Sequence, residues 1–413
     1  MEDRVTHQPL GEGEPRKILL VDCDMFYVQV ARLEDPEGAG REDLLIVGGS
    51  PSGRGVVTSA SYQVRAYGVR SAMPTAQALR LCPRAVVVPV SRTACSARSR
   101  QVLAVLRRMA PVVQAASIDE FYLDLTGTER LLHHEALART AQRIREEVLE
   151  DTGISVSVGG GTRKLIAKLA AGRAKPAGVL VVPPGREEAF MREFRLAEIP
   201  GVGPALAQAL GERGLTTVDD ILPVDRSWLE EWFGRNRGGW LWGRARGLDD
   251  SRVSPYEPRK SVSSEKTFSK DIHDQEALER ALLRLVTGVG AALRKSGFRG
   301  RTVTVKVRDS DFRTRTGSHT LPAPIEADAT LLQAARALLL DLRQRRKGGV
   351  RLLGVGVSSL VEADEAPQLE LFQEDRTAES PRDRIVSRVV DGLKERFGED
   401  AVFPGGILED SDE

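Results

Sequence analysis

The sequence predicts an α+β protein of several domains, and two patterns support this prediction. In the N-terminal part, short apolar strands alternate with helices around pairs of acidic residues. Residues 263–361 then show the order β-α-β-β-α-β in a basic region of their own. The chain has 413 residues, which is more than one ordinary hydrophobic core supports, so separate domains are expected.

Composition narrows the class of protein. The chain is 41% hydrophobic and 29% charged, and no apolar run approaches the roughly 18 residues of a membrane span. Residues 1–17 are polar and lack the apolar core of a secretion signal. Three cysteines, an odd number without paired spacing, argue against a disulfide framework and against a cysteine zinc site. We therefore expect a cytoplasmic protein without membrane contact, and we take it to be a monomer.

Charge is unevenly distributed along the chain. The formal net charge is only +1, but residues 261–360 hold 18 Lys and Arg against 10 Asp and Glu. Residues 361–413 hold 6 against 16. A basic domain is thus followed by an acidic tail. The basic block is either a solvated surface or a face that contacts phosphates.

Acidic residues follow two apolar segments of the N-terminal part. Residues 17–24 read as a buried strand that ends in two aspartates, and residues 111–125 read as two strands joined by an acidic hairpin. A carboxylate at such a place is costly unless it is paired or binds a cation. Oxygen ligands favour Mg²⁺, and two Mg²⁺ ions can activate a 3′-hydroxyl and stabilise leaving pyrophosphate. Nucleotide cyclases and other two-metal enzymes fit equally well here. The acids are Asp22, Asp24, Asp119 and Glu120.

The remaining N-terminal elements complete this alternation. Residues 48–70, rich in Gly and Arg, are expected to form a small inserted subdomain. After the acidic hairpin, the periodicity predicts a helix, a strand, a helix and a strand, at 135–150, 154–158, 163–174 and 179–182.

Residues 196–215 resemble a helix-hairpin-helix, with two short helices linked by a turn that contains Gly201 and Gly203. A tight glycine turn exposes backbone N–H groups, which can bind a phosphate oxygen without reading the base sequence. The alternative is an ordinary turn between helices. Four tryptophans that follow are expected to form a small-domain core: Trp228, Trp232, Trp240 and Trp242.

A linker rich in Pro, Ser and charge precedes the basic block. The block is predicted to contain strands at 263–269, 301–308, 312–320 and 352–360 and helices at 274–295 and 328–346. In the second strand, three valines share one face with core character. The other face could lie on a phosphate backbone, and it carries Thr302, Thr304, Lys306 and Arg308. A further helical stretch is predicted at 384–397 in the acidic tail.

Five segments occur in an order that resembles the Y-family DNA polymerases, in their DNA polymerase IV branch. They are VDCDMFYVQVA (21–31), TSASYQVRAYGVRSAMP (58–74), SIDEFYLDLT (117–126), AKPAG (174–178) and IPGVG (199–203). The resemblance covers residues 17–360 and implies a right-hand polymerase fold. It implies a palm (1–185) with inserted fingers (about 26–89), a helix-hairpin-helix thumb (186–250), a linker (251–262), a β-α-β-β-α-β little finger (263–361) and an acidic tail (362–413).

The resemblance also implies roles for single residues. Asp22, Asp119 and Glu120 would hold two catalytic Mg²⁺ ions, with the Cys23 carbonyl as a further ligand and Asp24 in support. Tyr27 would be the steric gate that rejects ribonucleotides, or else it packs in the core. The expected nucleotide contacts are Phe26 through its amide, Thr58 and Ser59 over the nascent base pair, and Tyr62, Arg65 and Lys175 on the triphosphate.

The segment QLELF resembles the short peptide by which bacterial polymerases dock on the sliding clamp; it contains Gln368, Leu369, Leu371 and Phe372. The implied function is template-directed addition of dNTPs to a primer 3′-end on primer–template DNA, with low fidelity and lesion bypass. Two other functions remain open: a catalytically inactive relative that couples the clamp to another polymerase, and a two-metal enzyme that needs no template.

Overall fold

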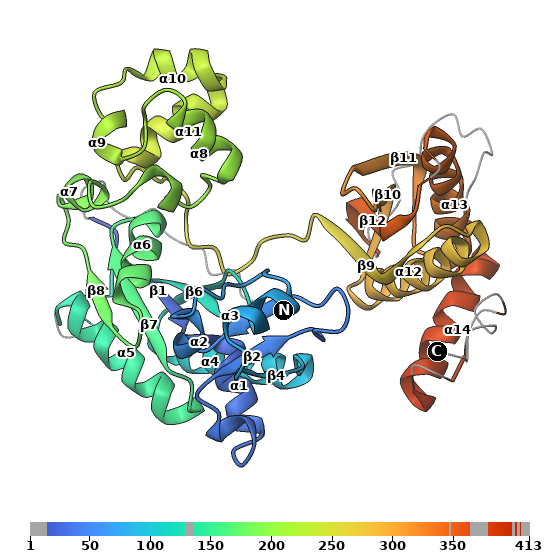
Figure 1. Cartoon of the computed structure of the whole chain (residues 1–413), viewed down its shortest axis with the longest axis horizontal. Helices are drawn as coiled ribbons and strands as arrows, with labels where there is room; N and C mark the ends of the chain where they lie inside the picture. The colour runs from blue at the N-terminus through green and yellow to red at the C-terminus, as the bar shows by residue number, and fades with distance from the viewer. Residues whose placement is uncertain are drawn as a thin grey trace. The chain divides into compact units, whose positions relative to one another are not determined.

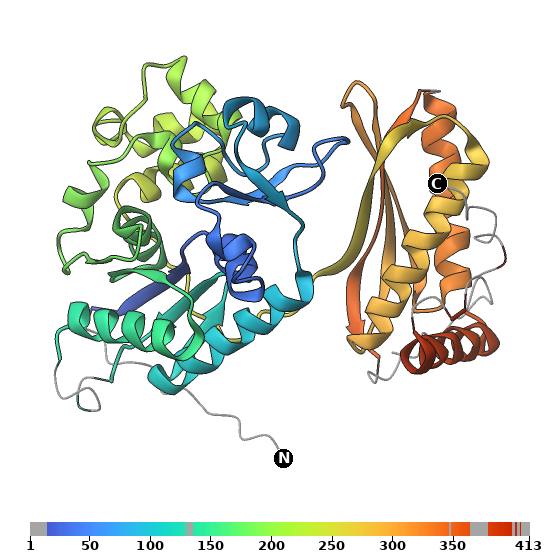
Figure 2. The same cartoon turned by 60° about the horizontal axis from the view of Figure 1, so that its bottom comes forward.

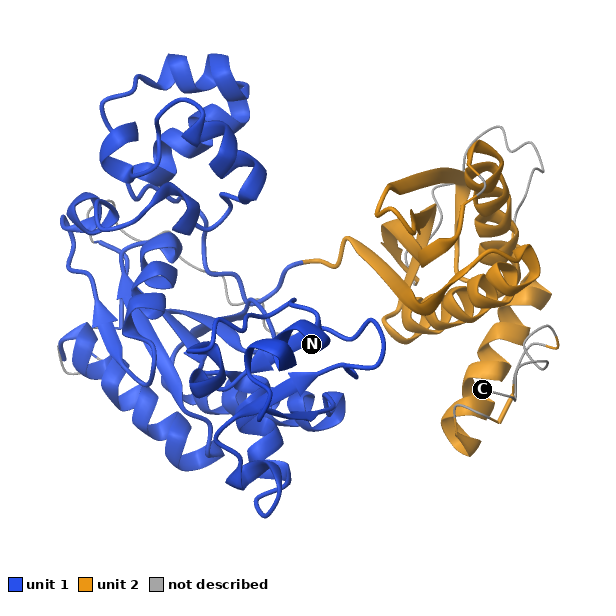
Figure 3. Ribbon diagram, viewed as in Figure 1, with its two compact units in different colours: residues 1–257 blue, residues 258–413 orange. Residues whose placement is uncertain are grey.

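The computed structural model describes residues 15–128, 130, 135–346, 348–363, 379–398, 401, 402 and 405. The chain divides into two compact units, Met1–Glu257 and Pro258–Glu413 (Figure 3). The division falls inside the segment expected to be a linker. Each unit is described by itself.

Unit 1 is built on a five-stranded sheet with β1 at its centre (Figure 1). β1 (Ile18–Cys23) pairs antiparallel with β6 (Glu120–Asp124) on one side and with β7 (Val156–Gly161) on the other. All six residues of β1 are buried, because both of its edges and both of its faces are covered. β5 (Val112–Ala115) and β8 (Val179–Val181) form the sheet edges.

Helices cover both faces of this sheet, and β1 alternates between them. Leu19 and Val21 share a core with α1 (Phe26–Glu34), α4 (Arg92–Met109) and α5 (Leu137–Thr152). Ile18 and Leu20 pack instead against α6 (Lys164–Ala174). α6 lies very close to β7: a methyl group on Gly159 would lie 2.0 Å from the Ala171 nitrogen. The position of α6 is therefore fixed by close packing, and α6 contributes to the candidate site below.

The inserted subdomain has its own three-stranded sheet, β3-β2-β4. Its strands are β2 (Leu45–Gly48), β3 (Val57–Ala60) and β4 (Val86–Val88), with η1 (Ala39–Arg41), α2 (Tyr62–Arg65) and α3 (Thr75–Leu81) between them. A separate small core lies under this sheet. The segment predicted from composition, 48–70, was too short, because β4 returns from farther along the chain to pair with β2.

A helical region completes unit 1. It contains α7 (Glu187–Met191), η2 (Leu196–Glu198), α8 (Pro204–Gly211), α9 (Val218–Ile221), α10 (Arg226–Phe233) and α11 (Arg235–Ala245). The first helix predicted for the hairpin is a single 3₁₀ turn, because Pro200 and Gly201, the latter at φ 101°, end it at once. The expectation of a four-tryptophan core was wrong for Trp228, which is 52% exposed, whereas Trp232, Trp240 and Trp242 pack against the core.

Unit 2 confirms the predicted β-α-β-β-α-β order. Its sheet, β11-β10-β12-β9, is antiparallel throughout. Helices α12 (Gln275–Lys295) and α13 (Asp328–Arg345) lie side by side on one face (Figure 2). The strands are β9 (Ser261–Ile272), β10 (Phe298–Asp309), β11 (Thr314–Ile325) and β12 (Val350–Glu362). The valines of β10 are buried under the helices, so its threonines and cations line the open face.

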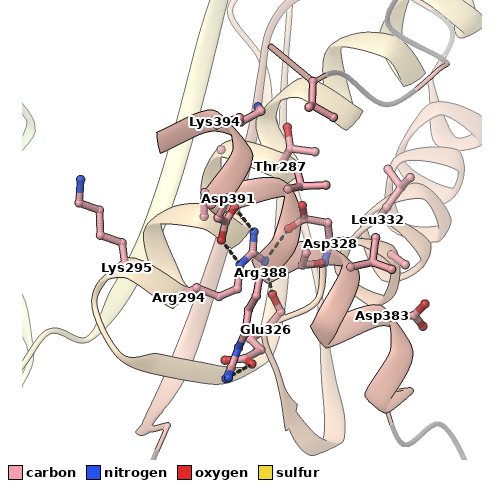
Figure 4. A pocket seen from close by; sticks show the side chains of 18 of the residues that line it. Thr287, Arg294, Lys295, Glu326, Asp328, Leu332, Asp383, Arg388, Asp391 and Lys394 are labelled. Carbon is pink, nitrogen blue, oxygen red and sulfur yellow. Dashed lines mark hydrogen bonds and ion pairs between the residues drawn. The ribbon is translucent and has the colours of Figure 1, made fainter. Parts of the chain in front are cut away.

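Within the described part of the acidic tail lies helix α14 (Pro381–Phe397), which docks through charged groups. Arg294 of α12 binds Asp391 at 2.5 Å and Asp328 at 2.8 Å, and Arg388 binds Glu326 at 2.7 Å (Figure 4). The helices α12 and α14 and the start of α13 line a cavity of about 1000 Å³. The apolar face of α14 points outward, with Ile385, Val386, Val389, Leu393 and Phe397 exposed. Among the described residues, no helix combines the length and apolar character needed to cross a membrane.

Candidate active site

Two of the predicted acids face each other across the central strand pair. Asp22, near the end of β1, is the register partner of Glu120, the first residue of β6. Asp119 lies next to them in the hairpin, and its carbonyl accepts a hydrogen bond from the Cys23 N–H at 2.9 Å. Burial raises the pKa of Asp22, and the negative charges of Glu120 and Asp119 raise it further against the effect of Lys175. The hairpin thus gathers carboxylates at a place where their charge is costly.

Two lysines of the α6 segment neutralise these acids. The Lys175 ammonium lies 2.6 Å from Oδ1 of Asp22, and the Lys168 ammonium lies 2.7 Å from both carboxylate oxygens of Glu120. Lys168 belongs to α6, and Lys175 is the C-cap residue at which α6 ends, so both lysines reach the acids from this segment. Sequence reasoning found Lys175 and missed Lys168. Local sequence gave no signal for Lys168, because its contact with Glu120 depends on how α6 packs.

Asp24 is saturated with hydrogen bonds. Its buried carboxylate accepts bonds from the hydroxyls of Tyr62 at 3.1 Å, Ser155 at 3.0 Å and Ser157 at 2.8 Å, and from the Ala177 N–H at 3.0 Å. It therefore joins the central sheet to the inserted subdomain and to the segment after α6. Burial and the nearby Asp24 charge raise the pKa of the Tyr62 phenol, so Tyr62 remains a hydrogen-bond donor.

The donor set suits a hard cation. Carboxylate oxygens are the ligands that Mg²⁺ prefers, and two of the three acids already hold a cationic group. The Cys23 side chain is buried in the core shared with Leu19 and Val21, on the face of β1 opposite to that of Asp22, so its carbonyl oxygen and not its thiol is available as a ligand. Within the part of the chain that the structure describes, no three acid, thiol or imidazole side chains are preassembled around a metal position.

The aromatic pair at the start of α1 has two different environments. Phe26 is almost fully buried, while Tyr27 is half-buried beside it, with the two rings edge to face at 5.6 Å. The first N–H groups of a helix have no partner within the helix. Because Phe26 begins α1, its N–H is free of helical bonding and suits the predicted phosphate contact. Tyr27, which is only half-buried, keeps part of its surface accessible to a ligand.

The remaining nucleotide candidates sit on β3 and α2. Arg65 lies over the Tyr62 ring at 5.2 Å and donates to the Ala60 carbonyl at 2.9 Å and to the Ser59 hydroxyl at 3.4 Å. Thr58 and Ser59 belong to the same strand and are half-buried and buried. The hydrogen bond from the Tyr62 hydroxyl to Asp24 connects these residues of β3 and α2 to the acidic edge of the central sheet.

Comparison with known proteins decides the family. A model of the impB/mucB/samB family matches residues 21–172, and a model of its C-terminal domain matches residues 259–371. A DNA polymerase IV of Desulfatibacillum aliphaticivorans is 38% identical over 95% of this chain and 97% of its own length. A DNA polymerase IV of Caulobacter vibrioides is 38% identical over 98% of this chain and 96% of its own length. The chain belongs to the Y-family DNA polymerases.

Solved structures confirm the fold class. A Y-family DNA polymerase chimera superposes with a TM-score of 0.75 at 26% identity, over 84% of this chain and 99% of its own. An insertion ternary complex of Dbh DNA polymerase superposes with a TM-score of 0.58 at 27% identity, over 84% and 99%. The fold is therefore that of a right-hand polymerase, with palm, fingers, thumb and little finger.

The DNA-contact candidates of this Y-family chain lie in the thumb and in the little finger. In the thumb, a methyl group on Gly201 would lie 2.6 Å from the Trp240 ring, so only glycine fits there, and Gly203 is the N-cap of α8. On the open face of the little finger, Lys306 pairs with Glu265, and Nε of Arg308 donates to the Thr314 hydroxyl at 2.8 Å. The clamp-peptide residues 368–372 lie outside the described residues.

Proposed function

We propose that this chain is a template-directed DNA polymerase that adds dNTPs to a primer 3′-end by two-metal nucleotidyl transfer, with low fidelity and in the bypass of damaged templates. The observation that supports the chemistry most directly is the meeting of Asp22 and Glu120 across β1 and β6, beside Asp119 and under two lysines. No observation favours the alternative of an inactive adaptor. The DNA polymerase IV relatives and the Y-family fold support the polymerase.

Asp22, Asp119, Glu120 and the Cys23 carbonyl would hold the two Mg²⁺ ions. When bound, the metal ions would lower the pKa of the primer 3′-hydroxyl and neutralise charge on the leaving pyrophosphate. The palm strands hold the acids in place before nucleotide arrives, since Asp22 and Glu120 are fixed by strand register. Asp24 keeps a structural role, because its oxygens already accept four hydrogen bonds.

The nucleotide is held by groups that surround this edge. Lys175 leaves Asp22 and Tyr62 turns its single O–H away from Asp24, and both then bind the triphosphate together with Arg65. Asp24 keeps its bonds from Ser155, Ser157 and Ala177. The Phe26 N–H at the start of α1 donates to a phosphate oxygen. The Tyr27 ring excludes a ribose 2′-hydroxyl. Two small side chains, Thr58 and Ser59, lie over the nascent base pair, where they leave room for altered template bases.

The proposed partners are primer–template DNA, which binds the thumb and the little finger, and a sliding clamp, which binds the tail. Primer–template DNA contacts the thumb turn at Gly201 and Gly203 through backbone N–H groups and the little finger at Lys306 and Arg308 through phosphates. A sliding clamp binds Gln368, Leu369, Leu371 and Phe372. The protein acts in the cytoplasm as a monomer. Replacing Leu371 and Phe372 with Ala should remove clamp-stimulated synthesis and spare the basal rate.

A primer-extension assay tests the proposal. Asp119→Ala should abolish Mg²⁺-dependent extension and leave binding to primer–template DNA unchanged. Asp341→Ala, which removes an exposed carboxylate paired with Arg345 on α13, is the matched control and should extend primers normally. Extension by Asp119→Ala at the wild-type rate would overturn the metal assignment. Incorporation of single dNTPs without regard to the template base would favour the template-independent alternative.

A further inference from the structure

The tip of the β10–β11 hairpin presents an aromatic ring to solvent. Residues 310–313 connect the two strands, and the Phe312 N–H donates to the Asp309 carbonyl at 3.0 Å. Phe312 is 63% exposed and adopts a left-handed backbone with φ 65°. That conformation is unfavourable for a residue with a side chain and is normally occupied by Gly or Asn. A bulky apolar residue is thus held in an unfavourable conformation where it covers no core.

One arginine contacts the ring, and other arginines cluster at the hairpin tip. Arg351 of β12 lies over one face of Phe312 at 4.5 Å. Asp309 and Asp311 are already shared by three other arginines: Arg315 binds Asp309, Arg346 binds both acids, and Arg313 binds Asp311. Arg308 donates to the Thr314 hydroxyl, and among the described residues neither Arg308 nor Arg351 forms an ion pair. The tip therefore combines an open aromatic face with positive charge that its own acids do not balance.

We propose that this hairpin tip is a stacking site for an unpaired nucleotide of the DNA strand. The base stacks on the face of Phe312 that Arg351 leaves open, while Arg308 and Arg351 contact the flanking phosphates. Aromatic rings beside cations are the usual means of holding single-stranded nucleic acid, because every base has a π-face. The site continues the open sheet face, where Thr302, Thr304 and Lys306 lead toward the tip. The inference rests on the proposed action on primed DNA.

Phe397 provides a matched control within the same unit. It is also 63% exposed and lies under an arginine, Arg396, at 5.2 Å, but on the tail helix α14. Exposure and a cation over the ring are thus shared by both residues. Only Phe312 lies at the end of the hydroxyl and cation face of the sheet. A difference between the two in DNA binding would isolate the site from a general effect of exposed aromatic residues.

Full-length protein is titrated by fluorescence anisotropy with a blunt duplex and with the same duplex carrying an unpaired 5′ template overhang. Phe312→Gly is the main variant, because glycine suits φ 65° and keeps the hairpin while it removes the ring. It should lose about 5- to 100-fold in affinity for the overhang substrate, and little for the blunt duplex. Phe312→Trp should retain the overhang preference, and Phe397→Ala should match wild type.

Photocrosslinking adds a positional readout. 5-Iodouracil is placed at successive positions of the overhang, one position per substrate. Only one of these positions should give a crosslinked peptide that contains Phe312. Equal losses on both substrates, or no loss with Phe312→Gly, would overturn the stacking site. Primer extension on an undamaged template separates this failure from failure of the proposed polymerase, since that assay tests the acids and not the tip.

Discussion

Lys168 offers the sharpest test of how the acidic edge works. The Lys168 ammonium contacts the Glu120 carboxylate, which is also an expected ligand of a metal ion. The lysine and the metal ion should therefore compete for this carboxylate. Lys168→Gln removes this competitor and keeps a polar side chain of similar length. The variant should therefore be less stable than wild type without metal, and the difference should disappear when metal binds.

The magnitude follows from the geometry. Both distances to Glu120 are 2.7 Å, and the two side chains are 37% and 24% exposed. Exposed ion pairs contribute about 0.2–1 kcal/mol and hydrogen bonds to charged groups about 1.5–3 kcal/mol. A partly screened, two-bond pair should contribute about 1–1.5 kcal/mol to the free energy of unfolding. In EDTA, Lys168→Gln should lower the Tm by about 2–6 °C for a unit of this size.

The assay is thermal unfolding across a Mg²⁺ titration. By linkage, the variant should bind metal about 5- to 12-fold more tightly, so its titration midpoint shifts to lower Mg²⁺. Lys164→Gln is the control: it lies one turn earlier on α6 and contacts Gln114 at 2.7 Å and the Tyr122 ring, not a site acid. A Tm loss that is equal in EDTA and in saturating Mg²⁺, with an unchanged midpoint, would refute the competition.

Three further outcomes are expected. Tyr27→Ala should admit ribonucleotides in single-nucleotide incorporation; unchanged discrimination would assign Tyr27 to packing. Burial raises the pKa of Asp22 above its ordinary value of 3.8, so Asp22 holds a proton more firmly in the folded protein than in the unfolded chain. Without metal, the free energy of unfolding should therefore fall as the pH rises from 3.8 through the raised pKa of Asp22. Metal-dependent stabilisation should then weaken as pH falls toward the raised pKa, and Asp22→Asn should lack both effects. Arg294→Gln leaves Asp391 and Asp328 without their buried partner and should lower the free energy of unfolding by about 3 kcal/mol. Helix α14 should then detach, and its amides should lose protection from hydrogen exchange. Full protection of the α14 amides would contradict this expectation.

Much of the palm could be predicted because its signals are local. Residues 18–21 form an uninterrupted apolar run that is followed directly by acids, and such a run predicts a buried strand with charges at its end. The alternation of Val303, Val305 and Val307 likewise defined both faces of β10 before any partner strand was known. Local periodicity determines which face is buried, so these predictions needed no tertiary information.

Other features depend on partners far along the chain. Lys168 reads as a solvated helix residue until α6 is seen to pack on β7 through Ala167 and Ala171, which leaves the lysine within reach of Glu120. The tail helix shows the same limit: a helical stretch was predicted there, but not that its polar side would pack on the rest of unit 2 while its apolar side is exposed. Arg294 and Glu326, which lie more than fifty residues earlier, supply the charges that hold it. A sequence pattern shows which side chains share a face of a helix, but it does not show which charged residues of other elements that face will contact.

The packing of α6 limits how the lysines can yield to metal and nucleotide. Ala167 and Ala171 of α6 pack on β1, and Leu165 and Leu169 pack in the core of the thumb region. Gly159 leaves no room for the helix to move toward β7. A shift of α6 would therefore disturb two cores at once, at several kcal/mol for the buried side chains involved. Lys168 and Lys175 must exchange partners by rotating their own flexible side chains, so the acids can be released while the helix and both cores stay in place.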